Sequence, residues 1–325
     1  MRAIIPVAGI GSRLKPHTHT TPKVLLNVGG KPILGHIIDK VVDAGVTKFT
    51  FVLGHLGEMV RDYVDTTYPN ITADYVEQVT AQGLGHAIYT AIPTFDDDEL
   101  FIILGDTIFD ANLKELFRQK HTSLGVKKVD DPRRFGVAIL RDGFIEKLIE
   151  KPREPVSNLA LVGLYYITNK NLFTECLEKL VNEDIRTKGE LQLTDALQLL
   201  IDAGEKVTAY PIEGWYDCGK PETLLATNSF LLSRGGSYTS TDSAIIIPPV
   251  YIPDSAKISN SVIGPYATIG ENVEIKDSIL RNSIIGDDAK IHCSLLTDSL
   301  IGRNSEIIGS FKQLNSGDST EIKFY

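Results

Sequence analysis

A six-residue period near the C-terminus constrains the fold more than any other feature of this sequence. Isoleucines recur six positions apart, and several of them stand directly before glycine. The spaced pairs are Ile252 and Ile258, Ile263 and Ile269, Ile269 and Ile275, Ile285 and Ile291, and Ile301 and Ile307. Hexapeptide repeats form parallel β-helices, in which three six-residue sides make a coil of about 18 residues. Residues 244–325 therefore predict roughly four coils. The alternative, a β-sandwich with chance spacing, would show a period of two.

The first hundred residues follow a different pattern, in which short apolar runs alternate with amphipathic helical segments. Buried strands are expected over 2–7, 48–53, 73–78 and 100–104, with helices near 33–44, near 57–66 and after Gly83. Such alternation predicts a mostly parallel sheet covered on both faces, and these sheets bind ligands beyond the carboxyl ends of their strands. A further helix should begin at Pro221 and stop before Gly235. We therefore expect a domain over 1–234, a small polar linker over 235–243 and the repeat domain over 244–325.

Charge and composition exclude several classes of function. The 325 residues carry 33 basic and 42 acidic side chains, and a net charge of −9 argues against nucleic acid or an anionic membrane as a partner. No apolar run reaches the ~18 residues of a transmembrane helix. The three cysteines support neither a disulfide framework nor a CxxC metal site, and no signal peptide is visible, so we expect a cytoplasmic protein. Residues 1–38 contain no Asp or Glu but carry basic side chains, which suggests that this segment handles a small anion.

The segment from Val7 to Leu14 follows the first strand and is the first candidate site. Its glycines allow close approach of a ligand to the backbone, and its amide groups can hold phosphate. The pattern is neither a dinucleotide fingerprint nor a P-loop. Two cations distinguish it, because Arg13 lies inside the segment and Lys23 follows in Thr-Thr-Pro-Lys. The alternative is a tight turn with solvated basic residues.

Three further motifs place charged groups after predicted strands or in turns. Asp106 follows the apolar strand at 100–104, where a carboxylate is well placed to hold a metal, although aspartate is also a common turn residue. Lys151 precedes a proline, which favours an extended or turn conformation that could hold an ammonium against phosphate. Asp217, beside the single tryptophan Trp215, is either a second metal ligand or part of a buried aromatic corner. The acidic run at 96–99 is expected to be a solvated loop.

Taken in order, these motifs resemble the sugar-1-phosphate nucleotidyltransferases, also called sugar-nucleotide pyrophosphorylases, over nearly the whole chain. Residues 8–16, with the later Pro22-Lys23, are similar to the family signature Gly-Gly-x-Gly-Thr-Arg-Leu-x-Pro, with Ala8 and Ser12 as small variants. Further blocks that match are Leu104-Gly105-Asp106, Phe135-Gly136-Val137, Glu150-Lys151-Pro152, Gly189-Glu190-Leu191 with Thr194-Asp195, and residues 215–219. The resemblance implies an α/β fold: a Rossmann-like catalytic domain with a mostly parallel sheet, followed by a short left-handed parallel β-helix.

The resemblance also implies a reaction, in which a nucleoside triphosphate and a sugar-1-phosphate give a nucleotide sugar and pyrophosphate. Arg13 and the loop amides would hold the triphosphate, and Lys23 would stabilise charge during transfer. Asp106 and Asp217 would hold Mg²⁺. The nucleotide would meet Ala8, Gly9, Gly11 and Ser12, with Gln78 and Gly83 at the base. The sugar phosphate would meet Gly136, Glu150, Lys151 and Trp215.

Substrate and assembly are less constrained. The sequence looks most like glucose-1-phosphate thymidylyltransferases with a β-helix tail, but UTP–glucose-1-phosphate and GTP–mannose-1-phosphate enzymes share the quoted residues. A missing methyl group changes binding by only ~1–3 kcal/mol, so dTTP and UTP could both serve. A bifunctional acetyltransferase would need more coils and a catalytic histidine, and the repeats contain only His292. A non-catalytic regulatory subunit should have lost Arg13, Lys23, Asp106 or Asp217, and all four are present. The repeats are expected to form a homo-oligomer.

Overall fold

The computed structural model describes residues 1–239, 243–309 and 314–323. They form two compact units. The first, here called the sheet unit, comprises residues 1–9 and 37–215; the second, the tail unit, comprises residues 10–36 and the described part of 216–325. Part of the linker predicted over 235–243 lies outside the described residues. In the described part of the chain, no helix is long and apolar enough to cross a membrane.

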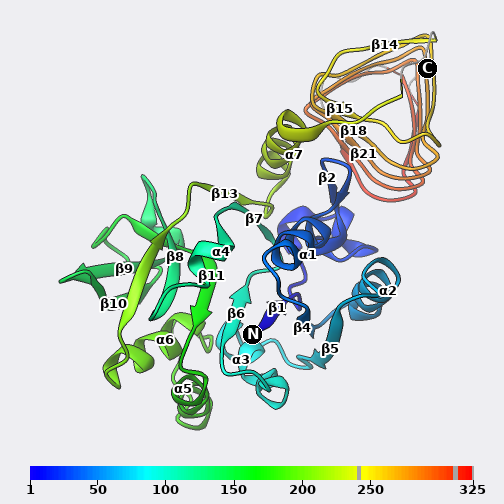
Figure 1. The fold of residues 1–325 in the computed structure, drawn as a ribbon. Helices are drawn as coiled ribbons and strands as arrows, with labels where there is room; N and C mark the ends of the chain where they lie inside the picture. The colour runs from blue at the N-terminus through cyan, green and yellow to red at the C-terminus, as the bar shows by residue number, and fades with distance from the viewer. Residues whose placement is uncertain (240–242, 310–313, 324–325) are drawn as a thin grey trace. The chain divides into compact units, whose positions relative to one another are not determined.

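The sheet unit is built on one nine-stranded mixed sheet (Figure 1). One half is parallel, in the order β6-β1-β4-β5, with β6 (Leu100–Ile103), β1 (Arg2–Pro6), β4 (Lys48–Leu53) and β5 (Thr72–Glu77). The other half holds β8 (Thr122–Lys128), β9 (Gly136–Arg141), β10 (Phe144–Glu150), β11 (Leu159–Ile167) and β12 (Val207–Pro211). Strand β11 joins the halves, because it pairs antiparallel with β6, β8 and β9. The mostly parallel sheet expected from the alternation is confirmed at its four predicted strands, and so is the Rossmann-like fold that the resemblance implies.

Helices of this unit bury one apolar face each. The unit contains α2 (Gly57–Thr67), α3 (Leu84–Thr90), α4 (Leu113–Leu116), α5 (Lys170–Asn182) and α6 (Leu193–Asp202), and α1 (Ile33–Asp43) enters it at residue 37. Their buried side chains recur three or four residues apart, as in α5, where Phe173, Cys176, Leu177 and Leu180 line one side. Helices α3, α5 and α6 pack on one another and share a single apolar core with the sheet. The unit also contains strand β7 (Thr107–Asp110) and the short helices η4 (Ile92–Thr94) and η5 (Pro132–Arg134), and strand β13 (Gly214–Asp217) begins in it.

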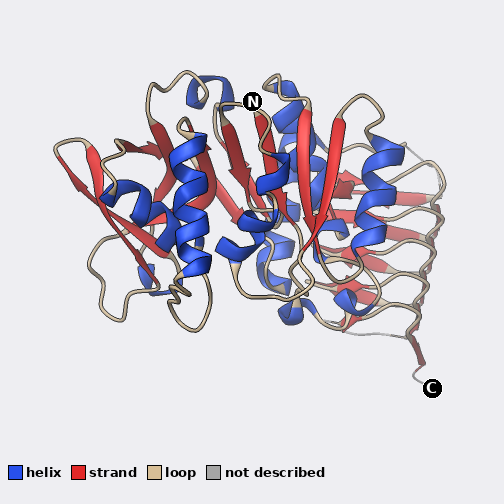
Figure 2. Ribbon diagram, turned by 90° about the horizontal axis from the view of Figure 1, so that it is seen from below, coloured by secondary structure: helices blue, strands red, loops and turns tan. Residues whose placement is uncertain are grey.

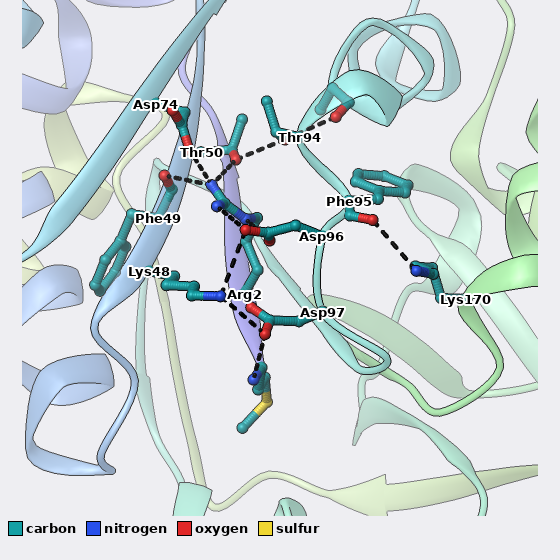
Figure 3. Close-up of polar contacts among 12 residues, drawn as sticks. Arg2, Lys48, Phe49, Thr50, Asp74, Thr94, Phe95, Asp96, Asp97 and Lys170 are labelled. Carbon is teal, nitrogen blue, oxygen red and sulfur yellow. Dashed lines mark hydrogen bonds and ion pairs between the residues drawn. The ribbon is translucent and has the colours of Figure 1, made fainter.

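A buried arginine at the amino end of β1 corrects one expectation. Arg2 is 3% exposed, and its guanidinium donates to Asp74, to Thr50 and, through Nε at 2.8 Å, to Asp96 (Figure 3). Lys48 Nζ lies 3.1 Å from Asp97. The acidic run at 96–99 is therefore not simply a solvated loop, because its first two carboxylates neutralise cations at the amino ends of β1 and β4. Arg2 and Lys48 belong to no recognisable motif, so only the tertiary fold reveals that they pair with the acidic run.

The tail unit stacks short parallel strands in three sheets (Figures 1 and 2). The first contains β14 (Ala244–Ile246), β17 (Ser261–Ile263), β20 (Ile279–Arg281) and β23 (Leu295–Thr297). The second contains β15 (Val250–Tyr251), β18 (Ala267–Ile269), β21 (Ile284–Ile285), β24 (Leu300–Ile301) and β26 (Asn315–Ser316). The third contains β16 (Lys257–Ser259), β19 (Glu274–Lys276), β22 (Lys290–His292), β25 (Glu306–Ile308) and β27 (Glu321–Lys323). These sheets form the predicted β-helix, and the repeated isoleucines stack inside it.

The coils are slightly shorter than the predicted 18 residues. Stacked partners are 17 residues apart for Val250 and Ala267, 16 for Ile269 and Ile285, and 15 for Leu300 and Asn315. Buried serines stack between the coils, and the Ser278 amide donates to Ser261 Oγ at 3.1 Å. Internal hydrogen bonds of this kind satisfy polar groups that the stacking removes from water.

The tail unit also contains an N-terminal segment and a helix. Residues 10–36 form the short helices η1 (Ser12–Leu14), η2 (His17–His19) and η3 (Lys23–Leu25) and the strands β2 (Asn27–Val28) and β3 (Lys31–Pro32). Helix α7 (Pro221–Gly235) begins at the expected proline. Its buried Asn228 accepts from the Gly29 amide at 2.8 Å and donates to the Tyr266 carbonyl at 3.1 Å. One side chain of α7 thus connects the N-terminal segment to the β-helix.

Candidate functional site

In the sheet unit, the structure brings Gln78 and Gly83 together at the carboxyl end of β5. Gln78 is buried, its backbone N–H donates to the Leu53 carbonyl, and its side-chain nitrogen lies 3.1 Å from the Gly83 carbonyl. Gly83 has φ 115° before α3, and a Cβ there would lie 2.6 Å from the Leu191 carbonyl. Only glycine fits this conformation and this contact. The end of the segment that follows β5 is therefore held against the backbone of Leu191, whose amide donates to the Gln82 carbonyl at 2.8 Å.

A second cluster forms where β9 and β10 pair. Gly136 is the partner of Glu150 in the register, and a Cβ at Gly136 would lie 3.0 Å from Glu150 Oε2. The Glu150 carboxylate accepts from the Thr194 hydroxyl at 2.7 Å and pairs with Lys151 Nζ at 3.1 Å. The structure thus brings Gly136, Glu150 and Lys151 together. A largely buried carboxylate held by a hydroxyl and an ammonium is suited to accepting hydrogen bonds from a sugar.

Lys151 has an uncommon backbone conformation. Its φ is 43°, in the left-handed region that non-glycine residues rarely adopt, so of the extended and turn conformations that the sequence predicted it is not the extended one. The Lys151 amide donates to the Phe135 carbonyl at 3.0 Å, which fixes the turn. Strained non-glycine residues concentrate at functional sites. The side chain remains 44% exposed, so its ammonium is accessible to a ligand.

Four buried side-chain polar atoms in this unit have no hydrogen-bond partner among the described residues, and two of the four belong to the motifs quoted above. These two are Trp215 Nε1 and Asp195 Oδ2. Trp215 packs edge-on against Phe135, with ring centroids 4.8 Å apart, which matches the aromatic corner weighed above. Burial raises the pKa of the Asp195 carboxyl, and the nearby Glu150 raises it further. Asp195 and Thr194 were missed as site residues, although their Thr-Asp motif was visible in the sequence.

In the tail unit, the signature segment is folded around Gly11. This glycine has φ 67°, and a Cβ there would lie 2.9 Å from the Lys23 Cβ. The Thr18 hydroxyl donates to the Gly11 carbonyl at 2.9 Å. Lys23 itself is 8% exposed. The glycine is therefore needed so that the loop can close over the lysine.

Arg13 and Asp217 meet at Gly219 in the same unit. A Cβ at Gly219 would lie 2.8 Å from Asp217 Oδ1 and 3.0 Å from Arg13 Nη2. The glycine of the Trp-Tyr-Asp-Cys-Gly motif thus leaves room for both side chains. The neighbouring Cys218 is fully buried and serves packing.

The remaining predicted residues lie at the ends of central strands. Ala8 and Gly9 follow β1, and a Cβ at Gly54 would lie 2.6 Å from the Ala8 carbonyl. Asp106 follows β6 and accepts from the Thr107 hydroxyl at 3.4 Å. The predicted residues are divided between the units: Ala8, Gly9, Gln78, Gly83, Asp106, Gly136, Glu150, Lys151 and Trp215 belong to the sheet unit, and Gly11, Ser12, Arg13, Lys23 and Asp217 to the tail unit.

The donor set is compatible with a hard divalent cation. Among residues 1–239, 243–309 and 314–323, no three or more His, Cys, Asp or Glu side chains cluster in a way that could hold a metal ion by themselves. Mg²⁺ uses one or two carboxylates and completes its shell with phosphate oxygens and water. Asp106 and Asp217 offer such carboxylates, so their chemistry fits this ion.

Sequence reasoning missed the contacts between the signature segment and the last coil. His17 Nε2 is hydrogen-bonded to Asn315 Oδ1, and the Thr20 hydroxyl donates to Asp318. A Cβ at Gly317 would lie 2.8 Å from Pro16 Cβ. Burial lowers the pKa of His17. No local signal could have found these pairs, because the partners are separated by 298 residues.

Comparison with known proteins identifies the family. The model of the family described as nucleotidyl transferase matches residues 2–234. The low-salt glycan biosynthesis nucleotidyltransferase Agl11 of Haloferax volcanii is 32% identical over 319 residues, covering 88% of this chain and 87% of that protein. A glucose-1-phosphate thymidylyltransferase of Streptomyces antibioticus is 34% identical, with 86% of this chain and 81% of that protein covered. The UTP–glucose-1-phosphate uridylyltransferase AglF of Haloferax volcanii is 37% identical and covers 68% of this chain and 93% of its own length.

A solved structure supports the same family assignment. A candidate glucose-1-phosphate thymidylyltransferase from Bacillus anthracis superposes with a TM-score of 0.63 at 28% identity, over 74% of this chain and 98% of that protein. The family match spans the strands and loops that hold most of the site residues described above. The chain belongs to the nucleotidyl transferase family and is a sugar-1-phosphate nucleotidyltransferase.

Proposed function

We propose that this protein transfers a thymidylyl group from dTTP to glucose-1-phosphate, giving dTDP-glucose and pyrophosphate, with UTP as the alternative nucleotide. The observation that carries the proposal is the contact between Gln78 and Gly83, which are the positions matched to nucleobase contacts by resemblance. The thymidylyltransferase relative from Streptomyces antibioticus also extends over 86% of the chain, whereas the uridylyltransferase relative covers 68%.

In the proposed reaction, a phosphate oxygen of the sugar-1-phosphate attacks the α-phosphorus in line, and pyrophosphate leaves. Both substrates are polyanions and the protein has a net charge of −9, so local cations are needed to offset repulsion. Arg13, with the amides around Gly11 and Ser12, holds the triphosphate, and Lys23 stabilises charge during transfer. No covalent intermediate with the protein is needed, because positioning and charge stabilisation supply the catalysis.

The sugar phosphate and the metal have separate residues in this proposal. Glu150 and the Gly136 backbone bind sugar hydroxyls, Lys151 binds the phosphate, and Trp215 lies beside them. Enzymes of this family generally use a divalent metal ion, and we propose that it is Mg²⁺ held by Asp106 and Asp217. When bound, the ion would neutralise phosphate charge. Because nucleoside triphosphates are intracellular, we place the reaction in the cytoplasm.

We further propose that the β-helix mediates a homo-oligomer. The outward-facing residues of β14, β17, β20 and β23 are aliphatic and in register, namely Ile245, Val262, Ile279 and Leu295. Ile245 is 64% exposed and Leu295 is 43% exposed. A continuous aliphatic row on a monomer surface is typical of an interaction site. We name these four residues the aliphatic row.

The test is pyrophosphate release with Mg²⁺, crossing dTTP, UTP, GTP, ATP and CTP against glucose-, mannose-, galactose- and N-acetylglucosamine-1-phosphate. Highest kcat/KM with dTTP and glucose-1-phosphate is expected. A single strong result with GTP and mannose-1-phosphate would replace the proposed substrates. No turnover of any pair by the folded protein would favour a regulatory subunit.

A further inference from the structure

The side-chain amide of Gln78 is held from two sides. Its nitrogen lies 3.1 Å from the Gly83 carbonyl oxygen and 3.1 Å from His86 Nδ1. A carbonyl oxygen can only accept, so the NH₂ end of the amide must face Gly83. Both amide hydrogens are then used, one on each partner. The Gln78 oxygen accepts no hydrogen bond from any residue that the structure describes.

This arrangement requires a specific protonation state of His86. Because the Gln78 nitrogen donates, Nδ1 must carry the lone pair and the ring must be neutral, with its proton on Nε2. Burial and the nearby Arg186 both lower the pKa of His86, which favours the neutral ring.

Gln82 approaches the other side of the ring. Its oxygen accepts from Arg186 Nη2 at 2.8 Å, so its nitrogen is the atom 3.3 Å from His86 Nε2. A neutral imidazole has one acceptor nitrogen. In His86 this nitrogen is Nδ1, which accepts from buried Gln78 in the shorter of the two contacts. The Gln82 contact then brings two donors together, and Gln82 has to turn its NH₂ hydrogens away from His86 Nε2. Gln82 is only partly buried, so its amide hydrogens can reach water.

We infer that His86 is a positioning residue that fixes the orientation of the Gln78 amide and thereby determines which bases the enzyme accepts. The inference rests on the proposed function, in which Gln78 faces the base. With its oxygen turned toward the ligand, Gln78 is an obligate acceptor. Uracil and thymine present a ring N3–H group, and this oxygen can accept a hydrogen bond from it. Cytosine presents a lone pair at N3, which the oxygen would repel.

An unrestrained glutamine would not discriminate in this way. Rotation of its amide by 180° exchanges the positions of the oxygen and the NH₂ group. The NH₂ group would then donate to N3 of cytosine, so the same side chain would bind cytosine. The Gly83 carbonyl restrains the amide through one hydrogen bond, and His86 supplies the second. Removal of the His86 Nδ1 acceptor therefore weakens the preference for uracil and thymine over cytosine. It leaves the residues proposed to bind the sugar phosphate unchanged.

The test compares kcat/KM for UTP and CTP with glucose-1-phosphate in the full-length protein. His86→Leu removes the acceptor, and we expect the UTP-to-CTP ratio to fall about tenfold or more. His86→Asn places an oxygen acceptor near the position of Nδ1, so we expect it to restore much of the ratio. His121→Leu is the matched control: this histidine packs edge-on against Phe144, and the ratio should stay as in the unchanged protein. If His86→Leu does not fold, His86→Phe provides a ring without an acceptor.

The outcomes are distinguishable. An unchanged UTP-to-CTP ratio in folded His86→Leu or His86→Phe overturns the inference and leaves the proposed function intact. A fall in the ratio accompanied by an equal rise in the KM for glucose-1-phosphate also overturns it, because that result indicates general disruption. Absence of transfer from dTTP and UTP in the unchanged protein overturns the proposed function, and the inference with it.

Discussion

Lys151 combines a left-handed backbone conformation with an accessible ammonium, and this combination defines a prediction at the residue scale. Lys151→Ala should raise the KM for the sugar-1-phosphate about tenfold or more, with a smaller effect on the KM for the nucleotide, because a charge-assisted contact to one substrate is lost. Lys147, which is exposed on strand β10 just before Lys151, is the matched control. Initial rates at varied glucose-1-phosphate measure the effect. An equal rise in both KM values would contradict the assignment of Lys151 to the sugar phosphate.

Asp217 allows a test of the metal proposal with minimal change of shape. Asp217→Asn keeps the packing around Gly219 and removes the carboxylate charge, so Mg²⁺-dependent turnover should fall by at least about a hundredfold. The measurement is pyrophosphate release over a range of Mg²⁺ concentrations. Asp142→Asn, at a carboxylate that is 94% exposed, should have no effect. Full activity of Asp217→Asn would remove this residue from the metal site.

His17 predicts a pH dependence of stability. Burial lowers its pKa in the folded state, whereas an unfolded histidine titrates near 6.5. In the window below about 6.5, the unfolded state therefore binds the proton first, and stability falls as the pH decreases through it. Above that window the contribution of His17 is fully present. Thermal unfolding from pH 5.5 to 7.5 should show a smaller decrease in Tm for His17→Gln than for the unchanged protein. Identical pH slopes would show that His17 is not responsible.

At the scale of elements, Arg2 stabilises the amino ends of β1, β4 and β5. Arg2→Ala would leave Asp74 and Asp96 without their main cation. Breaking a buried ion pair costs about 3–5 kcal/mol, and since both carboxylates here are about half exposed we expect about 1–3 kcal/mol. Denaturant unfolding measures this change. Arg141→Ala, which breaks an exposed pair with Glu146, should change the free energy of unfolding much less than Arg2→Ala does. Equal costs would mean that the burial of Arg2 is energetically unimportant.

The elements differ in how far the sequence predicts them. Buried strands such as β1 and β6 are continuous apolar runs, and the stacked isoleucines have a visible period, so both were predicted correctly. The coil length was overestimated, because the isoleucine spacing reports two sides of each coil while the register of Ile269 with Ile285 gives 16 residues. The acidic run at 96–99 was interpreted as solvated because a local pattern cannot reveal a partner such as Arg2.

The candidate site was predictable where its residues form contiguous motifs and unpredictable where they meet through the fold. The Gln78 and Gly83 positions followed from family motifs. The restraint of Gln78 by His86 did not, since it depends on which face of α3 meets the end of β5. The association of residues 10–36 with the tail was likewise invisible. Its contacts, such as that of His17 with Asn315, join residues that carry no motif.

At the scale of the whole molecule, the tail therefore has two separable consequences. Its last coil contacts the segment that carries Arg13 and Lys23, and we propose that its aliphatic row binds a second copy. Ending the chain at Arg234 would remove the last coil and the aliphatic row together. A truncation alone therefore cannot distinguish a role in ordering the segment that carries Arg13 and Lys23 from a role in assembly. It also tests the domain boundary predicted at residue 234.

Two point substitutions separate these consequences. Ile279→Asp places a charge in the aliphatic row, and we expect a lower oligomeric state by sedimentation, with the KM for the nucleotide retained. Asn315→Ala removes the partner of His17, and we expect the KM for the nucleotide to rise severalfold with the oligomer intact, because the segment that carries Arg13 and Lys23 becomes less ordered. An unchanged sedimentation coefficient for Ile279→Asp would remove the aliphatic row from any interface. If Asn315→Ala instead dissociated the oligomer, the last coil would act in assembly. The order of the segment that carries Arg13 and Lys23 would then depend on the last coil only indirectly.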